Sequence, residues 1–130
     1  MTSALRLYIE AWLEKAKHDI MSAERLLQIE PRILDTACFH CQQAIEKYLK
    51  AYLAFNERDI QRTHNIILLL SQCAEFDAVF ATIDIGNLNA YAVHARYPDM
   101  LEMPELEEAE SHYRLAIRIR GLVMERIRFE

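Results

Sequence analysis

The sequence predicts an all-α protein, an up-and-down antiparallel bundle of about five helices. Apolar residues recur at steps of three and four along most of the chain. Two Gly and three Pro are too few for the turns of an all-β fold. Apolar residues make up 52% of the chain, which excludes a disordered or collagen-like protein. Because no linker, repeat or low-complexity tract interrupts the pattern, residues 1–130 are expected to form one domain.

The first two predicted helices have the most regular stripes. The first is expected to end near Glu30, because Pro31 disfavours helical backbone in the residue before it. Asp35 is the predicted cap of the second. The stripe of the first comprises Leu5, Ile9, Trp12, Ala16, Ile20, Ala23 and Leu27. The stripe of the second comprises Cys38, Cys41, Ile45, Tyr48, Leu49 and Tyr52.

The later helices are predicted from shorter patterns. Thr63 is a plausible N-cap for a short third helix. A fourth helix would open at Asp77 and run past Tyr91, with Gly86 as an irregularity in its middle. Pro104 suits the first position of the last helix, whose acidic start and arginine-rich end complement the helix dipole.

Charge and composition exclude several function classes. The net charge of −5 and the pI of about 5.5 leave no global basic field to hold a polyanion. No apolar run approaches the roughly 20 residues that a membrane span needs, so no membrane association is expected. Three Cys without a secretory pattern indicate reduced thiols in a cytoplasmic protein.

The Cys38-x-x-Cys41 spacing, with His40 between, raises the question of zinc. Tetrahedral zinc needs four converging ligands, and only Cys73 is left as a third thiol. On a helix His40 points away from the face that Cys38 and Cys41 share. The three thiols are therefore expected in the core, and neither a metal nor a cofactor is predicted.

The other side of the second predicted helix carries polar donors. His40, Gln43, Lys47 and Lys50 follow one another at helical spacing. This stripe could present donors to a phosphate or a nucleotide base. The alternative is an ordinary solvated face.

A second group of candidates follows the fourth predicted helix. Arg96 offers a planar fork that matches phosphate, and Tyr97 offers a stacking surface for a base. Asp99 and His94 lie beside them. Alternatively, Pro98 only stops the helix while Arg96 caps its last carbonyls.

His64 lies at the N-terminal turn of the third predicted helix, after Arg58 and Arg62. A histidine there suits either an acid/base group or a simple surface residue. The sequence contains no Gly-rich phosphate loop and no Ser/His/Asp signature that would name an enzyme class.

The stretch CFHCQQAIEKYLKAYL, residues 38–53, resembles the second helix of the HEPN family (higher eukaryotes and prokaryotes nucleotide-binding domains). Further matches come in the expected order along nearly the whole chain. They are Ala16, Asp19 and Ala23, then His64, Ile66 and Leu69, and finally Arg96-Tyr97-Pro98-Asp99.

The resemblance implies a helical bundle that dimerises, often with its functional site in the cleft between protomers. Many bacterial members are small proteins encoded beside a minimal nucleotidyltransferase, in pairs similar to toxin–antitoxin modules. Our leading hypothesis is therefore a homodimeric nucleotide- or RNA-binding module that acts with such a partner. Its predicted site comprises Arg96, Tyr97, Asp99, His64, Lys47, Lys50, His40 and Gln43.

Other members of the wider superfamily are metal-independent ribonucleases, whose signature is an Arg, four to six residues, and a His. Here no His follows Arg96 until His112, and the Arg58–His64 pair flanks the second connection instead. Arg96 is therefore carried over as a phosphate contact without a catalytic His. A ribonuclease that uses Arg96 with His64 or His94 remains the enzymatic alternative, and an assembly partner without a ligand is the third.

Overall fold

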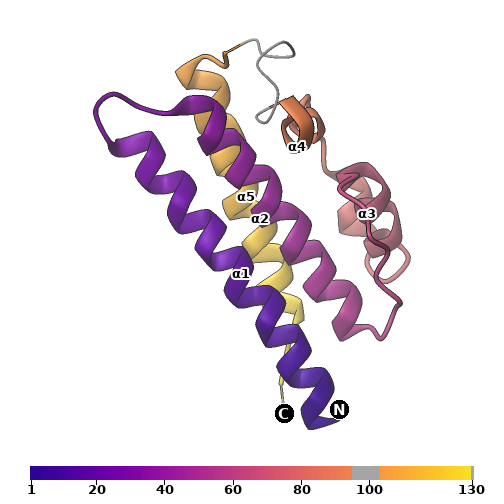
Figure 1. Ribbon diagram of the computed structural model, residues 1–130. Coiled ribbons are helices and arrows are strands. Elements are labelled where there is room, and N and C mark those ends of the chain that lie inside the picture. Colours follow the sequence, from indigo (N-terminus) through magenta and orange to yellow (C-terminus); the bar gives the residue numbers. More distant parts are fainter. Residues whose placement is uncertain (95–102, 130) are drawn as a thin grey trace.

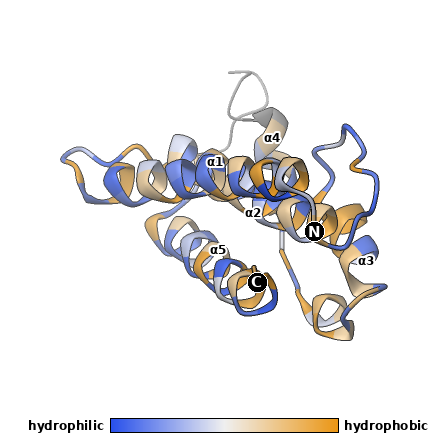
Figure 2. Cartoon of the chain, turned by 90° about the horizontal axis from the view of Figure 1, so that it is seen from below, coloured by the Kyte–Doolittle hydropathy of each residue, from blue (hydrophilic) through white to orange (hydrophobic). Residues whose placement is uncertain are grey.

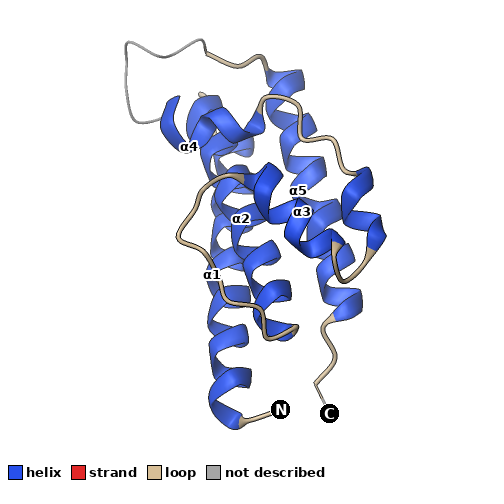
Figure 3. Ribbon diagram, turned by 90° about the vertical axis from the view of Figure 1, so that its right-hand side faces the viewer, coloured by secondary structure: helices blue, strands red, loops and turns tan. Residues whose placement is uncertain are grey.

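The computed structural model describes residues 1–94 and 103–129, and every regular element among them is helical (Figure 3). The predicted all-α class is confirmed, since no strand occurs in these ranges. None of the helices is long and apolar enough to cross a membrane, as far as these ranges extend. The elements are α1 (Ser3–Gln28), α2 (Leu34–Phe55), α3 (Ile66–Ala74), the 3₁₀ helices η1 (Ala78–Thr82) and η2 (Leu88–Ala90), α4 (Tyr91–His94) and α5 (Leu106–Arg126).

Three long helices form the body of the molecule (Figure 1). α1 and α2 lie side by side in opposite directions, and α5 runs in the direction of α2 along the same pair. Seen from below, α5 lies beneath the layer formed by α1 and α2 (Figure 2). The shorter elements from α3 to α4 make the return leg on the far side of α2, so the up-and-down order holds.

Small side chains form the contact between α1 and α2. Ala16 and Ala23 of α1 are fully buried, as is Ala44 of α2. These residues lie on the same helix faces as Asp19 of α1 and Lys47 of α2, which contact each other. Alanine at such positions lets two helix axes approach closely, because the distance between axes depends on the side chains at the contact.

α2 is the central helix of the molecule. It packs against α1, α3, α4, α5 and η2 and therefore carries buried residues on every side. The predicted inner stripes of α1 and α2 are confirmed as buried or half-buried. The other side of α2, however, is not the solvated face that the polar pattern allowed, since Lys50 is only 6% exposed.

The predicted fourth helix is wrong as a continuous element. Asp77 does cap η1, accepting a hydrogen bond from the backbone N–H of Val79 at 3.0 Å. The chain leaves helical geometry at Ile83, which is extended. Gly86 then has a left-handed φ of 57°, and its N–H bonds to Oδ1 of Asp84. A side chain that bonds the backbone two residues on stabilises a turn in place of a helix.

Three predicted helix starts also need correction. Asp35 lies inside the first turn of α2, where the preceding residue makes no side-chain cap. Asn65, not Thr63, caps α3, because its side chain accepts from the N–H of Leu68 at 3.3 Å. Pro104 lies two positions before α5, so it rigidifies the approach to that helix without being its first residue.

Candidate functional site

Two buried carboxylates organise the polar residues of the bundle, and Asp19 is the first. It is 7% exposed and lies between two donors from α2. Its Oδ1 is 2.8 Å from Nδ1 of His40, and its Oδ2 accepts from Nζ of Lys47 at 2.5 Å. A buried charge is tolerated when it is paired and hydrogen-bonded, and the two donors of this cluster link α2 to α1.

Glu46 is the second buried carboxylate, at 3% exposure. Its Oε2 accepts from Nζ of Lys50, one helical turn further along α2, at 3.0 Å. Its Oε1 lies 2.7 Å from Nδ1 of His64 in the segment before α3. Lys50 in turn lies 5.5 Å from the centroid of the Trp12 ring on α1, within the range of a cation–π contact.

His64 differs from the residues that hold it, because its side chain is 61% exposed while that of Glu46 is 4% exposed. Its backbone carbonyl also accepts from Nε2 of Gln42 at 3.2 Å. The second ring nitrogen, Nε2, has no hydrogen-bond partner within residues 1–94 and 103–129. The arrangement therefore presents one nitrogen of an oriented imidazole to solvent.

The remaining donors of the predicted α2 stripe face inward. Lys47 and Lys50 direct their ammonium groups at Asp19 and Glu46, and Gln43 donates to Oε1 of Gln42 at 2.6 Å. A direct ligand contact by these residues stays a prediction. In the structure the lysines hold carboxylates. Among the described site residues that join a carboxylate, His64 has the most exposed side chain, at 61% against 26% for His40 and 22% for Lys47.

The second group of candidates lies outside the described residues. Arg96, Tyr97 and Asp99 fall in the range 95–102, and His94 is described only as the last residue of α4. The element before them is nonetheless fixed beside His64. Asn89 of η2 accepts from the N–H of Ile66 at 2.8 Å and donates to Oδ1 of Asn65 at 3.1 Å.

These contacts tie η2, which leads directly into α4, to the start of α3, the helix that His64 precedes. Arg58, the arginine at signature spacing from His64, forms an ion pair with Glu75 at the end of α3. Its guanidinium therefore links the loop to α3.

Two comparisons with known proteins bear on the family of this chain. A family model described as the HEPN domain matches residues 9–127. This chain belongs to the HEPN family. The crystal structure of an archaeal HEPN homologue is similar to it, with a TM-score of 0.67, 26% sequence identity, and coverage of 92% of this chain and 98% of the homologue. No significant match was found among curated proteins.

Membership of the HEPN family is consistent with a function that involves nucleotides or RNA. Residues 38–53, whose sequence carries the resemblance, form most of the central helix α2. They include Glu46 and Lys50, one of the two buried clusters. In this HEPN domain the family-like stretch therefore supplies both core packing and the support of His64.

The three cysteines belong to the core of the HEPN domain, as predicted. Cys38, Cys41 and Cys73 are fully buried and free. Burial raises the pKa of Cys38 and of Cys73 to about 12, and it raises the pKa of Cys41 as well. No group of three or more metal-ligating side chains occurs in the described ranges.

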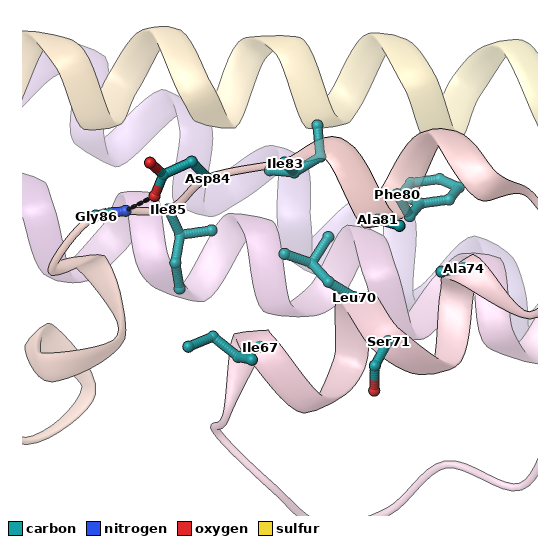
Figure 4. A pocket seen from close by; sticks show the side chains of 10 residues that line it. All are labelled: Ile67, Leu70, Ser71, Ala74, Phe80, Ala81, Ile83, Asp84, Ile85 and Gly86. Atoms are coloured by element: carbon teal, nitrogen blue, oxygen red, sulfur yellow. Dashed lines mark hydrogen bonds between the residues drawn. The ribbon is translucent and has the colours of Figure 1, made fainter.

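An apolar pocket of about 580 Å³ lies between α3 and the segment that follows it (Figure 4). Its walls come from α3, η1 and the turn at Gly86, and Ile67, Leu70 and Phe80 point into it from two sides. Ile67 is 60% exposed. Because its lining is mainly aliphatic, the pocket has few groups that could orient a charged ligand.

Asp19 and Glu46 are the site residues that sequence reasoning missed. Each has one apolar and one basic neighbour in the sequence, and a carboxylate in such a setting is usually assigned to the surface. The neighbours are Ile20 and His18 for Asp19, and Ile45 and Lys47 for Glu46. The available signal was the spacing of Glu46 and Lys50, four positions apart, which suits an ion pair. The partnership of Glu46 with His64 spans a loop, and no local pattern encodes it.

Proposed function

We propose that this HEPN domain binds a nucleotide or an RNA segment at a local site beside His64. The observation that carries the proposal is the exposed imidazole held by the buried carboxylate of Glu46. Functional groups need a fixed geometry that the surrounding residues enforce, and Glu46 and Gln42 provide it here. Arg96 and Tyr97 follow α4 in the sequence and are proposed to supply the phosphate and base contacts.

The net charge supports a local site over a broad one. With a net charge of −5, the chain has no excess of cations to hold a long stretch of nucleic-acid backbone. Binding should therefore depend on a few contacts and weakly on salt. A steep salt dependence of RNA affinity would contradict this part of the proposal.

We further propose that the protein acts as a homodimer with a nucleotidyltransferase partner, in a toxin–antitoxin-like pair. The support is the resemblance of residues 38–53 and of the Arg96-Tyr97-Pro98-Asp99 stretch to family members of that kind. Light scattering of the pure protein tests the dimer, and co-purification with a nucleotidyltransferase encoded beside it tests the partner. Partner binding without any nucleotide or RNA binding would favour a purely structural assembly role.

The binding proposal is tested by titrating labelled RNA and labelled nucleotides with the wild type and two histidine variants. We expect His64→Ala to weaken binding by about 3- to 10-fold, the range of one lost hydrogen bond. His18→Ala is the matched control, because its side chain is 60% exposed and also contacts a carboxylate, that of Glu14 on α1. Equal losses in both variants would remove His64 from the site.

Arg96→Ala extends the same titration. We expect weaker binding and a melting temperature within a few degrees of the wild type, because the residue is proposed to contact the ligand. Unchanged binding, or an unfolded variant, would give Arg96 a structural role instead.

A metal-independent ribonuclease is the second candidate. It is favoured by Nε2 of His64, which has no partner among the described residues. RNA cleavage through the 2′-hydroxyl needs a group that moves a proton, and an oriented imidazole can do so. The test is cleavage by purified protein in EDTA. Loss of about 10²-fold or more in His64→Ala, with His18→Ala unchanged, would make the protein an enzyme. If the wild-type protein leaves the RNA intact, the ribonuclease is refuted and the binding function remains the proposal.

A further inference from the structure

The orientation of the His64 ring is fixed by contacts from α2. Its Nδ1 lies 2.7 Å from Oε1 of Glu46. Gln42, which is fully buried, uses Nε2 to contact the same Oε1 at 3.4 Å and the backbone carbonyl of His64 at 3.2 Å. One amide therefore holds both the carboxylate and the backbone of the histidine, and the ring has little freedom to turn.

The charges of the cluster already balance without His64. Glu46 supplies one negative charge and Lys50 one positive charge, and their side chains are 4% and 7% exposed. The third hydrogen bond of the carboxylate goes to the imidazole of His64. Since an ionised carboxylate only accepts, Nδ1 of His64 must carry the proton of that bond. In the neutral form of this imidazole, Nε2 is then the nitrogen with the lone pair.

A ring nitrogen that can only accept a hydrogen bond binds only groups that donate one. Phosphate oxygens offer acceptors, so they gain nothing from Nε2 in this tautomer. The hydroxyl groups of ribose are donors, and the 2′-hydroxyl is the group that separates RNA from DNA.

We propose that Glu46 is a positioning residue that holds His64 as a hydrogen-bond acceptor, and that Nε2 of His64 binds a ribose 2′-hydroxyl. The site then prefers ribonucleotides to deoxyribonucleotides. The ligand half of this inference rests on the proposed nucleotide- or RNA-binding function. The positioning half rests on the cluster alone.

Nitrogen-15 NMR of the imidazole tests the positioning half without any ligand. In the wild type we expect His64 to show a protonated Nδ1 and an unprotonated Nε2. The double variant Glu46→Leu/Lys50→Met replaces the buried ion pair by apolar side chains of similar size, which often leaves stability unchanged or higher. In it, we expect the two tautomers of His64 to mix. A protonated Nε2 in the wild type, or an unchanged tautomer in the double variant, would overturn the role of Glu46.

Paired oligonucleotides test the ligand half. A single-stranded RNA and a DNA of the same sequence, built from adenine and cytosine alone, differ only in the 2′-hydroxyl. We expect the wild type to bind the RNA about 3- to 10-fold more tightly. His64→Ala and the double variant should bind RNA as weakly as DNA, while His18→Ala should keep the preference.

The outcomes separate the two proposals. Equal binding of RNA and DNA by the wild type would refute the ribose contact and leave the binding module in place. Binding of neither strand would refute the proposed function and this inference together. If the double variant does not fold, the tautomer of the wild type still tests the position of the proton, and the His64→Ala titration still tests the ribose contact.

Discussion

The carboxylate of Asp19, halfway along α1, accepts a hydrogen bond from Nζ of Lys47 on α2 at 2.5 Å, and neither side chain is more than 22% exposed. His40 lies against the same carboxylate at 2.8 Å. The contact joins the two longest helices at a point where small alanines bring their backbones together. A polar cluster at this position constrains how α1 can slide along α2, because each donor must meet the carboxylate.

Asp19→Ala should therefore destabilise the protein by about 2–4 kcal/mol, since it leaves Lys47 partly buried without its counter-ion. The measurement is urea unfolding at neutral pH. Glu14→Ala, which removes an exposed partner of His18, should change stability by less than about 0.5 kcal/mol. The double variant Asp19→Leu/Lys47→Met should recover most of the loss. Equal effects of Asp19→Ala and Glu14→Ala would show that the buried pair adds nothing.

The two glycines should respond to substitution in opposite directions. Gly86 has a φ of 57°, and a Cβ there would meet nothing within 4 Å, so Gly86→Ala should cost about 1 kcal/mol through backbone strain alone. Gly121 lies within α5 with the same open space around it. Gly121→Ala should stabilise by about 0.5–1 kcal/mol, because alanine is the better helix former. Thermal unfolding of the two variants shows whether each substitution raises or lowers stability. A stabilising Gly86→Ala would contradict the left-handed turn.

The long helices were predictable because each buries one stripe that recurs with the helical period. Ile9 and Ala16 of α1 and Ile45 of α2 lie in the core as their spacing requires. Of the return leg, periodicity predicted the short helix α3. The turn of that leg at Gly86 depends on contacts far along the chain, since Asn87 donates to Glu108 of α5 at 2.6 Å.

Sequence reasoning selected the candidate site by residue type and did not predict how its residues connect. Basic and aromatic residues were selected because they suit nucleotides, and His64 was among them. The supporting carboxylates were missed, because Glu46 meets His64 across a loop 18 positions later. Asp19 likewise meets Lys47 from a different helix. Such pairs follow from the packing of whole helices, which a local pattern does not contain.

His112 should make stability depend on pH. It is 5% exposed on α5, and burial lowers its pKa below the usual 6.5, although Glu108 opposes the shift. The unfolded state then binds the proton more readily, so the contribution is present above pH 6.5 and is lost as the pH falls toward the lowered value. Urea unfolding between pH 8 and about pH 5 measures it.

His112→Gln is the comparison for that series, because the other histidines remain. Its free energy of unfolding should fall less steeply below pH 6.5 than that of the wild type. The difference in slope is limited to about 1.4 kcal/mol per pH unit, the value for one proton. Identical slopes in the two proteins would mean that His112 takes up its proton equally in the folded and unfolded states.

The three cysteines should resist modification while the bundle is folded. Burial raises the pKa of Cys38 from 9.0 to about 12, and it raises the pKa of Cys73 by the same amount. The fraction of each thiol that is ionised near neutral pH therefore falls about a thousandfold. Restricted access to fully buried sulfurs slows the reaction further. Labelling with a thiol-reactive disulfide reagent should therefore be at least about a thousandfold slower in native buffer than in urea, with three groups reacting after unfolding. Rapid labelling of the native protein would mean that α2 and α3 separate often enough to expose the thiols. The core assignment of the Cys38-x-x-Cys41 pair would then have to be abandoned.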